Sequence, residues 1–257
     1  DTQTYICSSC HRKFTPKDGF LWMKSNSEMI TVVLDLYNKG VSLRGVSDHL
    51  KQFYKKDVSH VTVLNWLRRY ESLVQSFTST LKPQLSDKWY ADETCIYFGK
   101  RLNWMWNVMD SDTRFLIAGN LTVFRQQKDA INTFEMCKKI GEPKQLCTDG
   151  LRHYQGSFKD AFPNAKHIIY SKPELKHNLY KMERFQGTVK ARTKVTRGYY
   201  SVNTARKLLN LLTLNYNFVR PHMALGGRTP AEASGINLNL GENRWLGMIE
   251  RSAEHVR

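Results

Sequence analysis

The sequence contains no uninterrupted apolar run near the roughly 20 residues that span a bilayer, and it does not begin with the charged-then-apolar pattern of a secretion signal. These absences predict an intracellular, cytoplasmic protein with no membrane partner. Cysteine is also scarce: five cysteines in 257 residues, only two of them closely spaced, exclude a disulfide framework and favour a reducing compartment.

Acidic residues are few as well, and the chain therefore carries a strong positive charge. Lysine and arginine number 39 against 23 aspartates and glutamates, which gives a net charge of +16 and a pI near 9.7. Such an excess indicates a polyanionic partner, with nucleic acid as the first candidate. The alternative is that the basic residues only keep the protein soluble. The apolar fraction of 41% is sufficient for a buried core, which excludes a disordered chain.

Residues 1–26 form a short polar segment around Cys7 and Cys10. The spacing of this pair resembles one half of a zinc ribbon, whose tetrahedral site needs two further ligands. His11 could be a third ligand, but the other cysteines lie far away in the sequence. Two interpretations stay open: a partial zinc ribbon whose partner knuckle lies upstream in a longer chain, or two thiols in a turn.

Residues 27–78 have the apolar periodicity of three helices. Gly40 is expected to end the first helix, and Ser42 and Ser59 are expected to cap the second and third. The last helix would expose His60, Thr62, Asn65, Arg68 and Arg69. A trihelical unit with such a face is typical of a helix-turn-helix domain, which places polar side chains in the DNA major groove. The alternative is a plain helical bundle with a solvated polar face.

After a linker over residues 79–87, the pattern predicts an α/β domain over residues 88–236 and a C-terminal tail over residues 237–257. Its predicted strands cover residues 88–98, 103–109, 114–122, 144–148 and 165–170, and its helices cover 126–140, about 154–161 and a long segment from about residue 178. The resulting order βββαβαβα is that of the RNase H-like fold, with a mixed five-stranded sheet.

Three acidic residues fall at informative places in this fold. Asp92 lies inside the first strand, Asp149 follows the fourth, and Glu183 lies on the last helix, 34 positions after Asp149. The first and fourth strands are neighbours, so the three carboxylates could meet at one edge of the sheet. Carboxylates that converge repel one another unless cations neutralise them. Hard oxygen ligands select Mg²⁺ or Mn²⁺, and a pair of such ions supports phosphodiester cleavage and strand transfer.

Each acid also has a structural interpretation. Asp149 followed by Gly150 is a common turn dipeptide. Glu93 should point to the face of the strand opposite Asp92, which makes it a poor competitor. Glu174 is a rival third acid, but the preceding proline places it in a loop, where it would be held less rigidly than a helical residue.

The segment after Glu183 is rich in lysine and arginine. Lys190 lies two helical turns beyond Glu183 and would share its face, where it could hold a phosphate beside the metal ions. Arg192, Lys194 and Arg197 would extend this positive charge toward bound DNA. A solvated basic helix face is the alternative.

Several strings resemble a known family, the insertion sequence 6 family of transposases with an integrase core. They are "YADET" at Asp92, "CTDG" at Asp149, "HNLYKMERFQGTVKARTKVTRGY" around Glu183 and "NYNFVRPHMALGGRTPAEASG" from Asn215, within residues 28–235. The resemblance implies a catalytic triad of Asp92, Asp149 and Glu183, a divalent metal requirement, recognition of terminal inverted repeats by the helix-turn-helix, and a homo-oligomer, a dimer or larger, on paired DNA ends. The Cys7 and Cys10 segment departs from the shortest members of this family.

The closing string has a physical interpretation of its own. Thr229, Pro230 and Glu232 are expected to start a helix, with the threonine as cap and the glutamate three residues later. Arg220 and His222 could contact DNA or brace the core, and the sequence does not separate these roles.

Together, the residues and the resemblance predict a DNA transposase. It would bind the terminal inverted repeats of an insertion sequence, cleave at the element ends and join the 3′ ends to target DNA. Two alternatives stay open: an RNase H-like nuclease or resolvase that hydrolyses without strand transfer, and a catalytically inactive, domesticated DNA-binding regulator. The predicted location is the cytoplasm, at the nucleoid in a prokaryote, or the nucleus for a domesticated eukaryotic copy.

Overall fold

A mixed five-stranded sheet forms the centre of the chain in a computed structural model, which describes residues 4–14, 19–20, 23, 25–98, 101–170, 179–196 and 201–255. The predicted sites Glu174 and Arg197 lie outside these ranges. The strands are β3 (Lys88–Phe98), β4 (Arg101–Asp110), β5 (Leu116–Thr122), β6 (Gln145–Thr148) and β7 (Lys166–Ile169), in the order β5-β4-β3-β6-β7. Strands β3, β4 and β5 pair antiparallel, whereas β6 pairs parallel with β3 and β7. The predicted mixed sheet is therefore confirmed.

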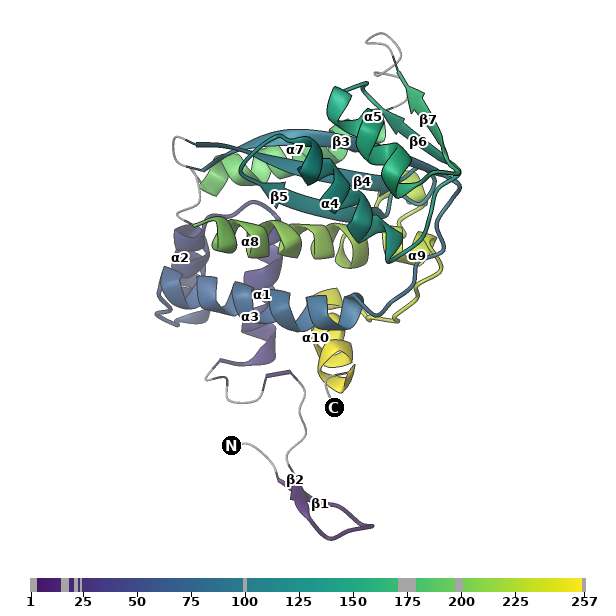
Figure 1. The fold of residues 1–257 in the computed structure, drawn as a ribbon. Helices are drawn as coiled ribbons and strands as arrows, with labels where there is room; N and C mark the ends of the chain where they lie inside the picture. Colours follow the sequence, from purple (N-terminus) through teal and green to yellow (C-terminus); the bar gives the residue numbers. More distant parts are fainter. Residues whose placement is uncertain are drawn as a thin grey trace.

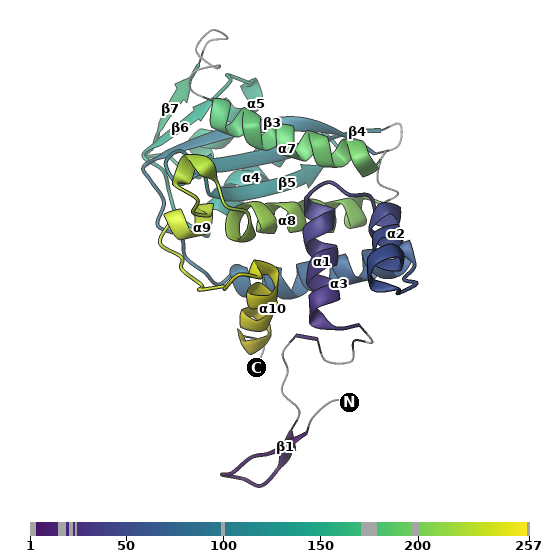
Figure 2. The same ribbon diagram turned by 180° about the vertical axis from the view of Figure 1, so that it is seen from behind.

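Helices cover both faces of this sheet. Helices α4 (Gln127–Lys138) and α5 (Arg152–Ala161) lie on one face, and α7 (Tyr180–Thr196) and α8 (Val202–Leu214) lie on the other (Figures 1 and 2). Phe134 of α4 packs against the rings of Tyr154, Phe158 and Phe162, which closes the α4 and α5 layer over the sheet. Among the described residues the order from β3 to α7 is βββαβαβα, as predicted.

The three helices expected before the sheet are α1 (Ser27–Asn38), α2 (Leu43–Tyr54) and α3 (His60–Thr78). Ser42 Oγ accepts from the Gly45 amide at 3.0 Å, and Ser59 Oγ accepts from the Thr62 amide at 3.1 Å, which confirms both predicted caps. Gly40 follows α1 with a φ of +102°, a conformation that glycine adopts without strain.

Helix α3 also packs along α8 of the sheet domain (Figure 1). The Asn210 amide donates to Glu71 Oε1 at 2.6 Å, and Lys207 Nζ donates to Ser72 Oγ at 2.7 Å. Arg68 donates to the Thr204 hydroxyl. The three-helix unit and the sheet are therefore packed against each other through α3 and α8, with polar contacts beside a shared apolar core.

The segment after residue 236, expected only as a tail, contains helix α10 (Arg244–His255). Trp245, Met248 and Ile249 are buried, and α10 packs against α1 and α3. The apolar spacing of three and four residues explains the helix, because it places these side chains on one face. The short helix α9 (Pro230–Ala233) begins with the predicted capping box between Thr229 and Glu232.

A two-stranded hairpin of β1 (Tyr5–Ile6) and β2 (Lys13–Phe14) extends away from the helices and the sheet (Figures 1 and 2). Across the described ranges, none of the helices is long and apolar enough to cross a bilayer.

Candidate active site

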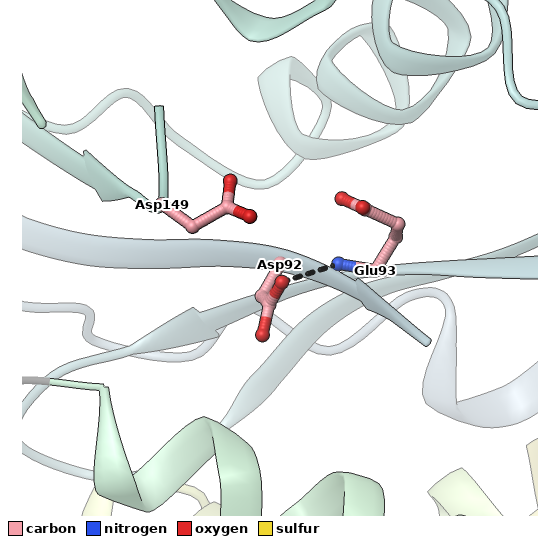
Figure 3. Close-up of side chains that lie close together, drawn as sticks. All are labelled: Asp92, Glu93 and Asp149. Carbon is pink, nitrogen blue, oxygen red and sulfur yellow. Dashed lines mark hydrogen bonds between the residues drawn. The ribbon is translucent and has the colours of Figure 1, made fainter. Parts of the chain in front are cut away.

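Three carboxylates meet where β3 passes the end of β6. One oxygen from each of Asp92, Glu93 and Asp149 lies within 4.8 Å of the others, and we call these residues the acidic cluster. Asp92 extends to one side of β3 and Glu93 to the other, while Asp149 reaches in from the end of β6 (Figure 3). The parallel pairing of β3 with β6 explains the convergence of Asp92 and Asp149, which the strand order predicted.

Asp92 is held by two donors. The Gln186 side-chain amide donates to Asp92 Oδ2 at 2.7 Å, and the Glu93 backbone amide donates to Asp92 Oδ1 at 2.9 Å. Burial, and after it the negative charges of Glu93 and Asp149, together raise the pKa of Asp92 to about 7. A cation beside this carboxylate would offset both effects.

Glu93 belongs to the acidic cluster although the strand alternation turns it away from Asp92. Its carboxylate forms an ion pair with Arg125 and accepts from the Tyr154 hydroxyl at 2.6 Å. Only 3% of the Glu93 side chain is exposed. The sequence prediction set Glu93 aside because alternation turns it away from Asp92. Alternation does not show that Asp149 lies close to the carboxylates on both sides of β3. No local signal could have revealed this, since Arg125 and Tyr154 are distant in the sequence.

Asp149 is exposed and begins the turn after β6. Its Oδ1 accepts from the Leu151 amide at 3.1 Å, and Gly150 has a φ of +84°. The turn interpretation of this dipeptide is therefore right, and it is compatible with the acidic cluster because the second carboxylate oxygen stays available.

Glu183 lies in the first turn of α7 and is exposed. In the part of the chain that the structure describes, it is not among the carboxylates whose oxygens lie within 4.8 Å of one another. Gln186, one turn later on the same helix, contacts Asp92, so Glu183 is displaced from the acidic cluster by about one turn of α7. Asp92 and Asp149 therefore meet as predicted, whereas Glu183 does not lie with them in this structure.

The donor set fits a divalent cation. All of its ligand groups are carboxylates, which Mg²⁺ and Mn²⁺ prefer to nitrogen or sulfur donors. Each Asp92 oxygen accepts one hydrogen bond and keeps a second lone pair for a metal. A cation beside Asp92 and the buried Glu93 would stabilise the ionised carboxylates at neutral pH.

The Cys7 and Cys10 pair lies in the turn of the β1 and β2 hairpin. Hydrogen bonds from the backbone of Cys10 and Ser9 lower the pKa of the partly exposed Cys7 thiol. Within the described residues, no additional His, Cys, Asp or Glu joins this pair to complete a metal-binding group. A zinc site at this position stays a prediction.

The basic residues of α7 divide between two faces. Lys190 and Lys194 are exposed, as expected. Arg192 is only 3% exposed, stacks 3.6 Å above the Tyr37 ring and donates to the Val41 carbonyl at 2.9 Å. Its predicted exposure toward DNA is therefore wrong. The reason is helical geometry: two residues turn the helix by about 200°, which moves Arg192 to the face opposite Lys190.

The five predicted contact residues of α3 also differ in exposure. His60, Asn65 and Arg69 are exposed in the first half of the helix. Thr62 is partly exposed, and its hydroxyl lies 3.0 Å from Ser59 Oγ in the helix cap. Arg68 faces α8, where it contacts Thr204, instead of sharing the exposed face.

Arg220 and His222 have separate roles. Arg220 is exposed, whereas His222 is half-buried and packs edge to face on Tyr216, with ring centroids 4.5 Å apart. The His222 ring lies 3.2 Å from the Tyr216 carbonyl, and burial lowers the pKa of His222. His222 therefore braces the fold, and Arg220 is the one available to a partner.

The profile of a protein family described as "Integrase core domain" matches residues 156–230. This range includes Glu183 but neither Asp92 nor Asp149. No curated protein sequence matches the chain.

Solved retroviral integrases are similar in structure. The catalytic core domain of HTLV-2 integrase, solved with magnesium in a dimeric form, is 13% identical, covers 60% of this chain and 97% of its own, and has a TM-score of 0.44. An intasome of simian T-cell lymphotropic virus, solved with the PP2A regulatory subunit B56 gamma, is 12% identical, covers 79% of this chain and 74% of its own, and has a TM-score of 0.49.

Proposed function

We propose that this chain is a metal-dependent DNA transposase of the DDE type. The observation that carries the proposal is the acidic cluster: Asp92, Glu93 and Asp149 converge on a sheet of RNase H-like topology. The integrase-core match over residues 156–230 supports polynucleotidyl transfer as the reaction class.

We assign the metal ligands to Asp92, Asp149 and Glu183. Mg²⁺ or Mn²⁺, when bound, activates an attacking oxygen and stabilises the leaving oxygen at phosphorus. Gln186 orients the Asp92 carboxylate, and Arg125 with Tyr154 holds Glu93 in its buried position. Glu183 lies in the first turn of the same helix as Gln186, one turn before it, and is the third ligand that we assign to the metal-bound state. Glu93 contributes negative charge to the cluster without leaving Arg125.

Recognition of the element ends is assigned to the first turns of α3. His60 and Asn65 are exposed there, Arg69 is exposed one turn further along, and Lys190 and Lys194 present positive charge on α7. Helix-turn-helix proteins read the major groove with such N-terminal residues of the second helix. We assign the terminal inverted repeats of an insertion sequence, of the insertion sequence 6 type, as the substrate, and a homo-oligomer on paired ends as the active form.

A joining assay tests this function. Duplexes that end in candidate terminal repeats with a free 3′ hydroxyl are incubated with a labelled second duplex and Mg²⁺ or Mn²⁺. The expected product is a covalent joint between the two duplexes. Glu183→Gln should abolish joining while leaving DNA affinity in EDTA unchanged, because the recognition residues lie on α3.

Two results would contradict the assignment. Cleavage without any joining, across a set of repeat sequences that the protein binds, would favour a nuclease. Joining that survives Asp92→Asn would remove the acidic cluster from the chemistry. The exposed Asp160→Asn change on α5 is the matched control, since it also neutralises one aspartate.

A further inference from the structure

Met223 is the most exposed of the large apolar residues that the structure describes, with 98% of its surface accessible. It lies at the tip of a tight turn, residues 220–228, which we call the Met223 turn. Single exposed apolar residues are ordinary on protein surfaces. The surroundings of Met223 are what make this one informative.

The Met223 turn is closed by its own backbone. The His222 amide donates to the Arg228 carbonyl and the Gly227 amide donates to the His222 carbonyl, each at 3.0 Å. The Gly226 amide donates to the Met223 carbonyl at 3.0 Å. Gly226 and Gly227 both have positive φ, which permits the sharp reversal. Met223 is therefore presented on a rigid support and not on a loose loop.

The base of the Met223 turn rests on the helix that carries Glu183. The His222 ring packs on Tyr216, and the Tyr216 ring packs on Phe185 with centroids 4.8 Å apart. Phe185 is two residues after Glu183 in α7. The position of Met223 is thus coupled through two ring contacts to the start of α7.

The charged residues within the turn are all basic. Arg220 and Arg228 are exposed at its two ends, and no acidic residue occurs between Asn215 and Thr229. Burial raises the pKa of Tyr216 to about 12, while Arg114, Arg220 and Arg184 lie near enough to act in the opposite direction. Three separate segments of the chain therefore bring arginines to the foot of the Met223 turn.

We propose that Met223 is a wedge that inserts between two stacked base pairs of duplex DNA and bends the duplex, while the flanking arginines bind the phosphates. The inference rests on the proposed function for the identity of the polyanion. Proteins that kink DNA insert apolar side chains, methionine among them, from a basic surface. The flexible, polarisable thioether suits contact with base faces. A contact with a second copy of the chain is the competing occupant, and the shared positive charge of both copies disfavours it.

Duplex bending tests the wedge without any metal. The probe is a duplex of about 30 base pairs with donor and acceptor dyes at its ends, titrated in EDTA to prevent cleavage. The wild-type protein should bend this duplex by an angle between about 20° and 90°. Met223→Ala should bind within about threefold of the wild-type affinity, because phosphate contacts dominate binding, but should leave the duplex straight. Met223→Leu should restore the bend, since leucine is also an apolar wedge.

Charge variants separate affinity from bending. Arg228→Gln should weaken binding and reduce the slope of log affinity against log salt by about 0.9. Lys159→Gln, which removes one exposed charge from α5 on the opposite face of the sheet, should leave bending unchanged.

Three outcomes overturn the wedge: no bend by the wild type, the same bend by Met223→Ala, or a loss of oligomer size on Met223→Ala by sedimentation, which would identify a contact between copies. Bending that depends on Met223 without any DNA joining would support the wedge and contradict the transposase. DNA joining together with a bend that does not depend on Met223 would support the transposase and contradict the wedge.

Discussion

Two regions of this molecule bury carboxylates and compensate them in opposite ways. At the interface between α3 and α8, Glu71 is 5% exposed and accepts from the Asn210 amide at 2.6 Å. The Ser72 hydroxyl donates to its other oxygen at 3.1 Å, and Lys207 Nζ lies 3.9 Å away. Every oxygen of this buried carboxylate has a donor, and a positive charge is close.

The acidic cluster lacks this balance. Its three carboxylates share a small volume, and among the described residues Arg125 is the one cation that forms an ion pair with any of them. Amide donors from Gln186 and the backbone orient Asp92 but bring no charge. Glu71 is therefore a completed structural contact, whereas the like charges of the acidic cluster are only partly offset by the protein.

The two regions should differ most in how stability changes when one carboxylate is neutralised. The unfolding free energy should rise in the acidic cluster and fall at Glu71. The pKa of Asp92 in the folded protein is raised to about 7 from 3.8, so folding is favoured while Asp92 is protonated. That stability is present in full below about pH 4 and is lost as the pH rises through about 7. Without metal, Asp92→Asn should therefore raise the unfolding free energy at pH 8 by on the order of 3 kcal/mol.

Urea denaturation in EDTA at pH 4 and pH 8 measures this effect. The gain from Asp92→Asn should shrink toward zero at the lower pH, and Mg²⁺ should stabilise the wild type at pH 8 but not the variant. An Asp92→Asn protein that is less stable than wild type at pH 8 would show that the cluster is compensated already.

Neutralising Glu71 should have the opposite sign. Glu71→Gln removes the charge that Lys207 faces and, unlike Asp92→Asn, relieves no repulsion between carboxylates. We expect a loss of about 1 to 3 kcal/mol, the usual cost of a buried polar group without its partner. Urea denaturation with and without Mg²⁺ should give the same loss. Glu135→Gln, at a side chain that is 54% exposed, is the control and should change stability by less than about 0.5 kcal/mol; an unchanged Glu71→Gln protein would remove the contrast.

Gln186 should affect the acidic cluster through Asp92. Gln186→Leu keeps the apolar packing of α7 but deletes the 2.7 Å hydrogen bond to Asp92 Oδ2. Because groups that orient metal ligands contribute roughly 10-fold to metal affinity, the Mg²⁺ concentration for half-maximal joining should rise about 10-fold. DNA affinity measured in EDTA should not change. An unaltered Mg²⁺ requirement would mean that Asp92 is oriented by β3 alone.

The smallest expected effect concerns Arg192, which joins α7 to the three-helix unit. Arg192→Lys keeps the charge but loses the flat stacking on Tyr37 and the hydrogen bond to Val41. We expect a loss of about 1 kcal/mol in unfolding free energy, with the salt dependence of DNA binding unchanged. Lys190→Gln should leave the unfolding free energy unchanged and weaken the salt dependence of DNA binding, because Lys190 is exposed. A weaker salt dependence in Arg192→Lys would restore Arg192 to the DNA-binding surface.

Local chemistry in the sequence determined the elements and their ends. Ser42, Ser59 and Thr229 cap helices as predicted, because a cap depends on residues within one helical turn. The aromatic and β-branched residues near both ends of β3 indicated its bounds. The placement of Asp92 beside Asp149 also followed from the sequence, once the order of the elements fixed β3 and β6 as neighbours.

Only the tertiary structure decided what surrounds those residues. Glu93 joins the cluster through Arg125 and Tyr154, and Arg192 is buried by Tyr37, although neither contact has a local signature in the sequence. The packing of α3 on α8, and that of the helix at residues 244–255 on α1 and α3, also depend on contacts between distant parts of the chain. The physical reason is range: caps and strand patterns depend on neighbours in the chain, whereas charge compensation and burial depend on side chains that folding brings together from distant positions.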